Sequence, residues 1–127
     1  MAAETNVLTR GYPIADAADL SADQYKIVKL AAGVVALAGA AEAGIGVLQN
    51  KPKDGGTGGR SASVMLLGTS RVVAGAAVAQ GAPVTADAAG KAVTATTGQA
   101  ATGIALEAAG GANAIIEILL TPGGQAA

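Results

Sequence analysis

The sequence has 127 residues, enough for one compact domain, with eight basic and nine acidic side chains and a formal net charge of −1. Neither histidine nor cysteine is present, which excludes zinc–thiolate sites, Ser-His-Asp and Cys-His catalysis, and disulfide frameworks. This charge balance does not predict the basic face with which proteins bind nucleic acid. Alanine and glycine supply 52 residues, about 41% of the chain, so the core side chains are small. We therefore expect stability to be completed by self-association or by a partner surface.

We expect no targeting or membrane segment in this sequence. Its first residues lack the basic start and apolar run of a secretory signal. The most apolar window, Leu30–Leu48, contains Glu42 and four glycines and is barely long enough to span a bilayer. We expect a protein that is made in the cytoplasm and does not bind a membrane.

The first 24 residues differ in composition from the rest. They contain three scattered aspartates and few apolar residues, and Pro13 disfavours helix at Tyr12. Ser21–Gln24 fits a helix capping box, which predicts one helical turn at most. We expect an extended N-terminal arm over residues 1–24, followed by a single β-rich domain over residues 25–127.

From residue 25 onward, short β-favouring runs alternate with glycine, which is typical of an all-β domain. In the last run, Ile116 and Ile118 share one face, whereas Ile115 and Leu119 share the other. Helix is conceivable only around Leu37–Ala43, and a glycine-rich loop is expected at Lys51–Arg60. The predicted strands are Tyr25–Leu30, Ile45–Gln49, Ser63–Leu67, Arg71–Val73, Pro83–Asp87, Ala92–Thr96, Gly103–Leu106 and Ala114–Thr121.

An internal repeat organises these strands. Ala31-Ala32-Gly33 matches Ala88-Ala89-Gly90, and Gly46-Val47 matches Gly103-Ile104, each pair 57 positions apart. Each half then ends in an apolar strand. The repeat predicts a mainly β fold, a small β-tulip-like barrel or sandwich built from two similar β units, with at most short helices.

No motif predicts catalysis, a cofactor or a metal site. The loop Asp54–Ser61 is rich in glycine but lacks the lysine of a phosphate-binding loop. The acidic residues are scattered, and no histidine or aromatic platform accompanies them. We therefore expect a protein that is not an enzyme.

A second, weaker pattern lies in Val73–Val84. Its spacing of valine and glycine resembles the strand-and-turn run of biotinyl and lipoyl carrier domains, in which Lys91 would be the modified lysine. Neither Met nor Asp precedes Lys91, so the sequence departs from the carrier pattern.

A longer match covers Arg71–Gly123 and includes Gly75, Val78, Gly81, Val84, Asp87, Gly90, Lys91 and Val93, followed by Gly103, Ala105 and Glu107. These turn and strand positions resemble the capsid decoration, or cement, proteins of tailed bacteriophages. The resemblance implies a virion structural protein, often trimeric, that binds the major capsid protein on the outer surface of the expanded head. It would clamp neighbouring capsomers, after synthesis in the host cytoplasm.

The arm supplies the candidate capsid-binding residues. An extended segment can add a strand to the edge of a capsid sheet, where main-chain hydrogen bonds provide the grip. The plain alternative is a disordered terminus. Another virion part, such as a tail-tube or fibre subunit, stays open as an alternative function. The candidate residues are Val7, Leu8, Arg10, Tyr12 and Ile14.

Overall fold

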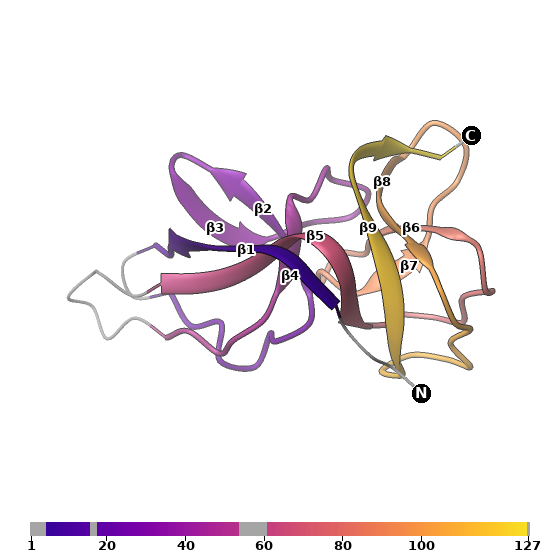
Figure 1. The fold of residues 1–127 in the computed structure, drawn as a ribbon, viewed down its shortest axis with the longest axis horizontal. Coiled ribbons are helices and arrows are strands. Elements are labelled where there is room, and N and C mark those ends of the chain that lie inside the picture. The colour runs from indigo at the N-terminus through magenta and orange to yellow at the C-terminus, as the bar shows by residue number, and fades with distance from the viewer. Residues whose placement is uncertain (1–4, 16–17, 54–60, 127) are drawn as a thin grey trace.

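The computed structural model describes residues 5–15, 18–53 and 61–126, and these residues form an all-β fold (Figure 1). The predicted mainly β class is therefore confirmed. None of the described residues belongs to a helix capable of crossing a membrane. The strands are β1 (Thr5–Pro13), β2 (Ile27–Ala31), β3 (Val34–Leu37), β4 (Gly46–Leu48), β5 (Ser61–Val73), β6 (Pro83–Ala86), β7 (Ala92–Thr94), β8 (Ala100–Ala105) and β9 (Ile115–Gln125).

The strands form one curled sheet. Its order is β3-β2-β4-β5-β9-β8-β6-β7, with every pair antiparallel, and β1 pairs with β5 outside this path. A parallel bridge between Ile14 and Val35 connects the end of β1 to β3. A second parallel bridge, between Ala74 and Ala92, connects the end of β5 to β7. The sheet thus curls into two small barrel-like units that share β5.

We define the N-terminal unit as the described part of residues 5–68 and the C-terminal unit as residues 69–126. Their strand pairings match one for one. Val47 and Leu48 of β4 pair with Met65 and Val64 of β5, as Ile104 and Ala105 of β8 pair with Leu119 and Ile118 of β9. The first strand of each unit matches as well, because β1 pairs with the first half of β5 as the second half of β5 pairs with β9.

Side-chain contacts repeat along with the strands. The Gly39 N–H donates to Glu42 Oε1 at 2.6 Å, and 57 positions later the Thr96 N–H donates to Gln99 Oε1 at 2.8 Å. The Ser63 N–H donates to Asn50 Oδ1 at 2.9 Å, as the Glu117 N–H donates to Glu107 Oε1 at 2.8 Å. The expected pair of similar β units is present down to individual hydrogen bonds.

Two hydrophobic clusters fill the fold. The first lies inside the N-terminal unit and consists of Ile14, Leu20, Val28, Val35, Leu48, Ala62 and Val64. All seven positions have equivalents in the second cluster: Ala74, Val78, Val84, Ala92, Ala105, Ile116 and Ile118. The second cluster also takes Ile27, Ala38, Val47 and Met65 from the N-terminal unit, so it joins the two units.

The N-terminal segment is extended, and it lies in the sheet rather than standing apart from residues 25–127. β1 pairs with β5 along its whole length, while Ile14 and Leu20 are buried in the first cluster. By equivalence, β1 is the first strand of the N-terminal unit. The described residues of the expected arm are therefore structurally continuous with the β-rich domain.

Some elements differ from the expectation. The strands predicted at Ser63–Leu67 and Arg71–Val73 are one strand, β5, and Gly68 has a φ of 113° where the pairing of β5 with β1 is irregular. β3 was not predicted, and no helix forms at 37–43. There, the carboxylate of Glu42 caps Gly39 and Ala41 has a φ of 57°, both features of a turn. Most of the expected loop at 51–60 lies outside the described residues.

Candidate interaction surfaces

The expected site residues of β1 point in different directions. Val7 is 68% exposed and Leu8 is 44% exposed, at a bulge in the pairing with β5. Leu8 lies directly across from Leu67, which is also exposed, so β1 and β5 present a small apolar patch. Ile14 is buried in the core and its side chain is not available to a partner.

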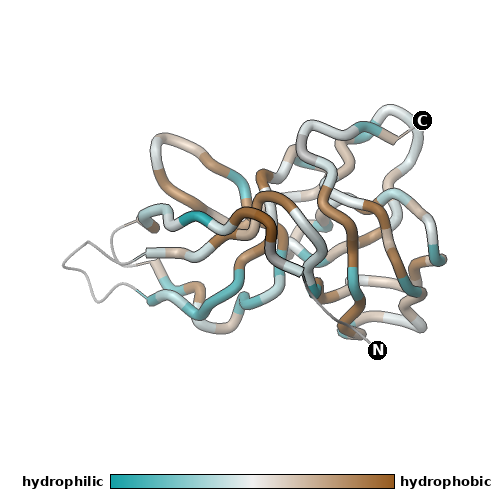
Figure 2. The backbone as a smooth tube through the Cα atoms, in the orientation of Figure 1, coloured by the Kyte–Doolittle hydropathy of each residue, from teal (hydrophilic) through white to brown (hydrophobic). Residues whose placement is uncertain are grey.

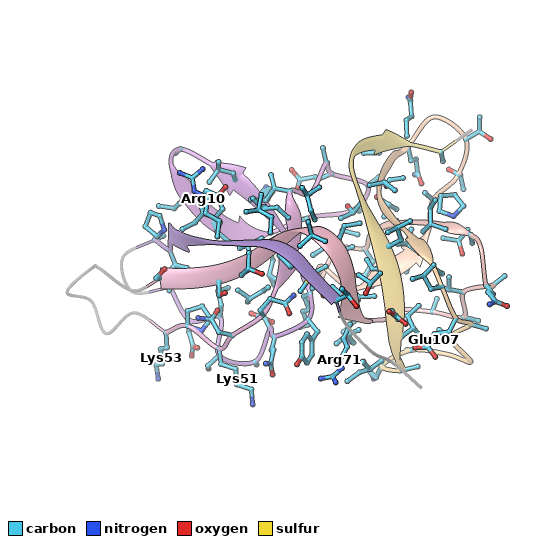
Figure 3. All side chains as sticks on the ribbon, in the orientation of Figure 1. Arg10, Lys51, Lys53, Arg71 and Glu107 are labelled. Atoms are coloured by element: carbon cyan, nitrogen blue, oxygen red, sulfur yellow. The ribbon has the colours of Figure 1, made fainter. Side chains whose placement is uncertain are left out.

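Arg10 and Tyr12 form a contact of their own. The Arg10 guanidinium lies 5.3 Å from the centroid of the Tyr12 ring, a cation–π arrangement. Tyr12 is half-buried and lines an apolar pocket of about 400 Å³ with Gly44, Ile45, Leu66, Leu67 and Gly123. Figure 3 shows Arg10 on the opposite side of the N-terminal unit from Lys51 and Lys53. We name Val7, Leu8, Leu67 and Tyr12 the β1 patch.

β1 has a second strand edge besides the one that pairs with β5. Among the described strands it pairs only with β5, apart from the single bridge from Ile14 to Val35. One edge is therefore occupied inside the chain, so an added strand would have to pair with the other edge, whose Pro13 end lies beside β3.

A second apolar surface lies on the C-terminal unit. Ile104 of β8 and Leu119 of β9 are direct cross-strand partners, and they are 36% and 41% exposed. Figure 2 shows that β9 is hydrophobic on both sides of one hydrophilic segment. Pro83 of β6, also partly exposed, pairs with Ile104. We name Pro83, Ile104 and Leu119 the β8 face. Sequence reasoning placed Leu119 on one side of its strand but gave no reason to single it out.

The charged side chains of the C-terminal unit mainly stabilise turns. The Asp87 carboxylate accepts hydrogen bonds from the N–H groups of Ala89 and Lys91. Lys91 Nζ donates to Asn113 Oδ1 at 2.7 Å, so this lysine is held against a neighbouring loop. Among the described residues, no group of acidic side chains is placed to hold a metal ion.

Two carboxyl groups have shifted acidity. A hydrogen bond from the Ser21 hydroxyl, then one from the Ser21 N–H, lowers the pKa of Asp19. Lys29, whose Nζ lies 3.0 Å from Glu42 Oε1, and the Gly39 N–H lower the pKa of Glu42. Both groups are exposed and accept hydrogen bonds from backbone N–H groups two or three residues away, which indicates local structural roles.

The comparisons with known proteins identify the fold. No protein-family model and no curated protein matches the sequence. Among solved structures, the N base of the head fiber protein gp8.5 of bacteriophage phi29 is similar, with a TM-score of 0.71 and 17% sequence identity. The alignment covers 90% of this chain and 95% of that one. The likeness spans both units and shows that the two proteins share a fold.

Proposed function

We propose that this protein is a structural component of a tailed-phage virion that attaches to the outer surface of the head. The observation that carries the proposal is the shared fold with a head fiber base over nearly the whole of both chains. The sequence supports it independently, because the turn and strand pattern of Arg71–Gly123 resembles that of decoration proteins. In this role the protein is not an enzyme and takes no cofactor.

The proposed partner is the major capsid protein of the expanded head, and the proposed contact is the β1 patch with the second edge of β1. Val7 and Leu8 project apolar side chains beside that edge, and Tyr12 lines the adjoining pocket. An added capsid strand would hydrogen-bond to the backbone of β1 while its side chains cover the patch. Such binding to the assembled shell alone stabilises the shell by mass action.

Two roles on the head fit this fold. A cement protein would clamp neighbouring capsomers as a trimer, gaining avidity from several contacts. A fibre base would hold a protruding segment on the head, and the structural relative is named as the N base of a head fiber protein. Heads that lose resistance to heat without the protein favour the first role, and heads of unchanged resistance favour the second.

The test is binding to purified expanded heads that lack the protein, measured by co-sedimentation. The wild-type chain should bind saturably to expanded heads and not to unexpanded ones. Replacing Val7 and Leu8 by Glu should weaken binding at least about tenfold, because charges replace apolar contacts. Ile115→Glu is the matched control, since Ile115 is a similarly exposed apolar strand residue on β9. A wild-type protein that ignores expanded heads would end the proposal.

The carrier alternative is less well supported by the geometry. A carrier lysine must swing freely at a hairpin tip, whereas Lys91 is hydrogen-bonded to Asn113. The adjoining Gly90 carbonyl also accepts a hydrogen bond from the Ile27 N–H of the other unit. Intact mass spectrometry of protein from its native host checks this alternative directly, because a carrier shows a covalent mass increase on Lys91.

A further inference from the structure

The two units bury one surface and expose its equivalent. On the N-terminal unit, Ile27, Val47 and Met65 are at most 2% exposed, within the cluster that joins the units. We name these three residues the β4 face. Their structural equivalents are Pro83, Ile104 and Leu119, which form the β8 face. The C-terminal unit covers the β4 face, but no described part of the chain covers the β8 face in the same way.

The covering surface repeats in the same manner. The C-terminal unit reaches the N-terminal unit through the turn between β6 and β7, where Ala86 O accepts from the Ala41 N–H at 2.9 Å. Gly90 O in the same turn accepts from the Ile27 N–H at 2.7 Å. The equivalent turn between β2 and β3 places Leu30 at the position of Ala86 and Gly33 at that of Gly90. Ala86 is buried, whereas Leu30 is 46% exposed.

Each chain therefore carries one unused copy of both halves of its internal interface. The β2–β3 turn and the β8 face lie on different units, toward opposite ends of the long axis (Figure 1). Within one chain these two surfaces are therefore too far apart to meet. A second copy aligned along the same axis can bring its β2–β3 turn to the β8 face of the first. We propose that the β8 face of one copy binds the β2–β3 turn of a second copy, head to tail.

The contact between copies relies on side chains more than the internal one does. Ile27 donates its N–H across the internal interface, but its equivalent Pro83 has no N–H to donate. The Gly98 N–H, equivalent to that of Ala41, is already bound by Ala126 O of its own chain. Apolar contact replaces these hydrogen bonds. Leu30 is larger than its equivalent Ala86, and Ile104 is larger than its equivalent Val47, so the contact between copies can bury more apolar surface. Such an interface joins two different patches, so it repeats and closes into a ring when the rotation permits.

The test is the association state of the purified full chain, measured by sedimentation velocity in the absence of heads. Wild type should associate, whereas Leu119→Glu and Leu30→Glu should each remain monomeric. An equimolar mixture of these two variants should form a one-to-one complex, because each supplies the intact surface that the other lacks. Ile115→Glu is the matched control and should associate like wild type. Its equivalent in the N-terminal unit, Ser61, is exposed and lies outside the covered face.

Several outcomes would overturn the proposal. The first is a monomeric wild type, and the second is association that survives both substitutions. The third is an equimolar mixture that forms no complex although both variants are folded. Because the chain has no cysteine, chains carrying Leu30→Cys and Ile104→Cys give a second readout without a charge change. A short bismaleimide should join the two different chains much faster than two identical ones. This inference is independent of head binding: a monomer that binds heads refutes it alone, and an oligomer that ignores heads refutes the proposed function alone.

Discussion

The two units use the same core positions with different side-chain sizes. In the N-terminal unit Leu48 and Ala62 occupy positions that Ala105 and Ile116 occupy in the C-terminal unit. The large side chain of the pair comes from β4 in the N-terminal unit and from β9 in the C-terminal unit, so neighbouring strands fill the same core volume. Hydrogen bonds at turns and the register of strands are retained. The comparison teaches that backbone geometry, rather than side-chain identity, is the shared feature of the units.

The largest expected effect tests the shared geometry. Gly46 and Gly103 are equivalent, and at each a Cβ would meet the backbone carbonyl oxygen of the neighbouring strand, at Met65 or Leu119. Gly46→Ala and Gly103→Ala should each lower the free energy of unfolding by about 2–4 kcal/mol, since backbone must shift. Urea denaturation measures this. Gly110→Ala is the control, because nothing lies within 4 Å of its Cβ position. Glycine variants as stable as this control would contradict the close strand approach.

The next effect tests the difference between the covered and the uncovered face. Met65→Ala should cost about 2–4 kcal/mol, because it leaves a cavity in the cluster that joins the units. Leu119→Ala, at the equivalent exposed position, should change the unfolding free energy of the monomer by less than about 0.5 kcal/mol. Denaturation at low protein concentration compares the two. Equal losses would mean that the β8 face is as well packed as the β4 face.

A smaller effect tests the hydrogen bond, present in both units, in which a side-chain oxygen accepts from a backbone N–H of the final strand. Asn50→Ala and Glu107→Ala each remove an acceptor for a backbone N–H, that of Ser63 or Glu117. The expected loss is about 1 kcal/mol in each case, read from thermal or urea unfolding. Glu107→Gln should lose less than Glu107→Ala, because its amide oxygen can still accept from the Glu117 N–H, as the Asn50 amide oxygen accepts from the Ser63 N–H. A loss in Glu107→Gln as large as in Glu107→Ala would refute the acceptor role.

The smallest effect separates two otherwise matched turns. Glu42→Gln should keep the hydrogen bond from the Gly39 N–H, as Gln99 keeps that from Thr96, but it loses the ion pair with Lys29. The folded pKa of Glu42 lies below its ordinary value of 4.5, so its stabilising contribution is present above that pH and disappears as the pH falls through the folded pKa. The small stability gap between wild type and Glu42→Gln at neutral pH should therefore close in acid. A gap that persists once the Glu42 carboxylate is protonated would contradict the assignment.

The sequence predicted the class of fold and the duplication because glycine turns and β-favouring runs are local signals. The match of Ala31-Ala32-Gly33 with Ala88-Ala89-Gly90 corresponds to equivalent turns in the two units. The role of β1 was not predictable in this way. Its equivalent is the second half of β5, and Gly11-Tyr12-Pro13 shares no residue type with Arg71-Val72-Val73.

The candidate surfaces were predicted only in part. Exposure of Val7 and Leu8 agrees with a binding segment, but burial of Ile14 depends on the distant partner Val35. The β8 face was missed because Ile104 and Leu119 become neighbours through strand register, which no local pattern reveals. Only the comparison of two folded units distinguishes a covered face from an uncovered one.

Sharing β5 between the units has a mechanical consequence. Its first half pairs with β1 and β4, and its second half pairs with β9, so one unbroken backbone runs from one unit into the other. Tension applied between the ends of the molecule is carried by covalent bonds at this junction and by rows of hydrogen bonds sheared on either side. The joint between the halves is thus stiff, without a linker that could stretch before the units themselves unfold.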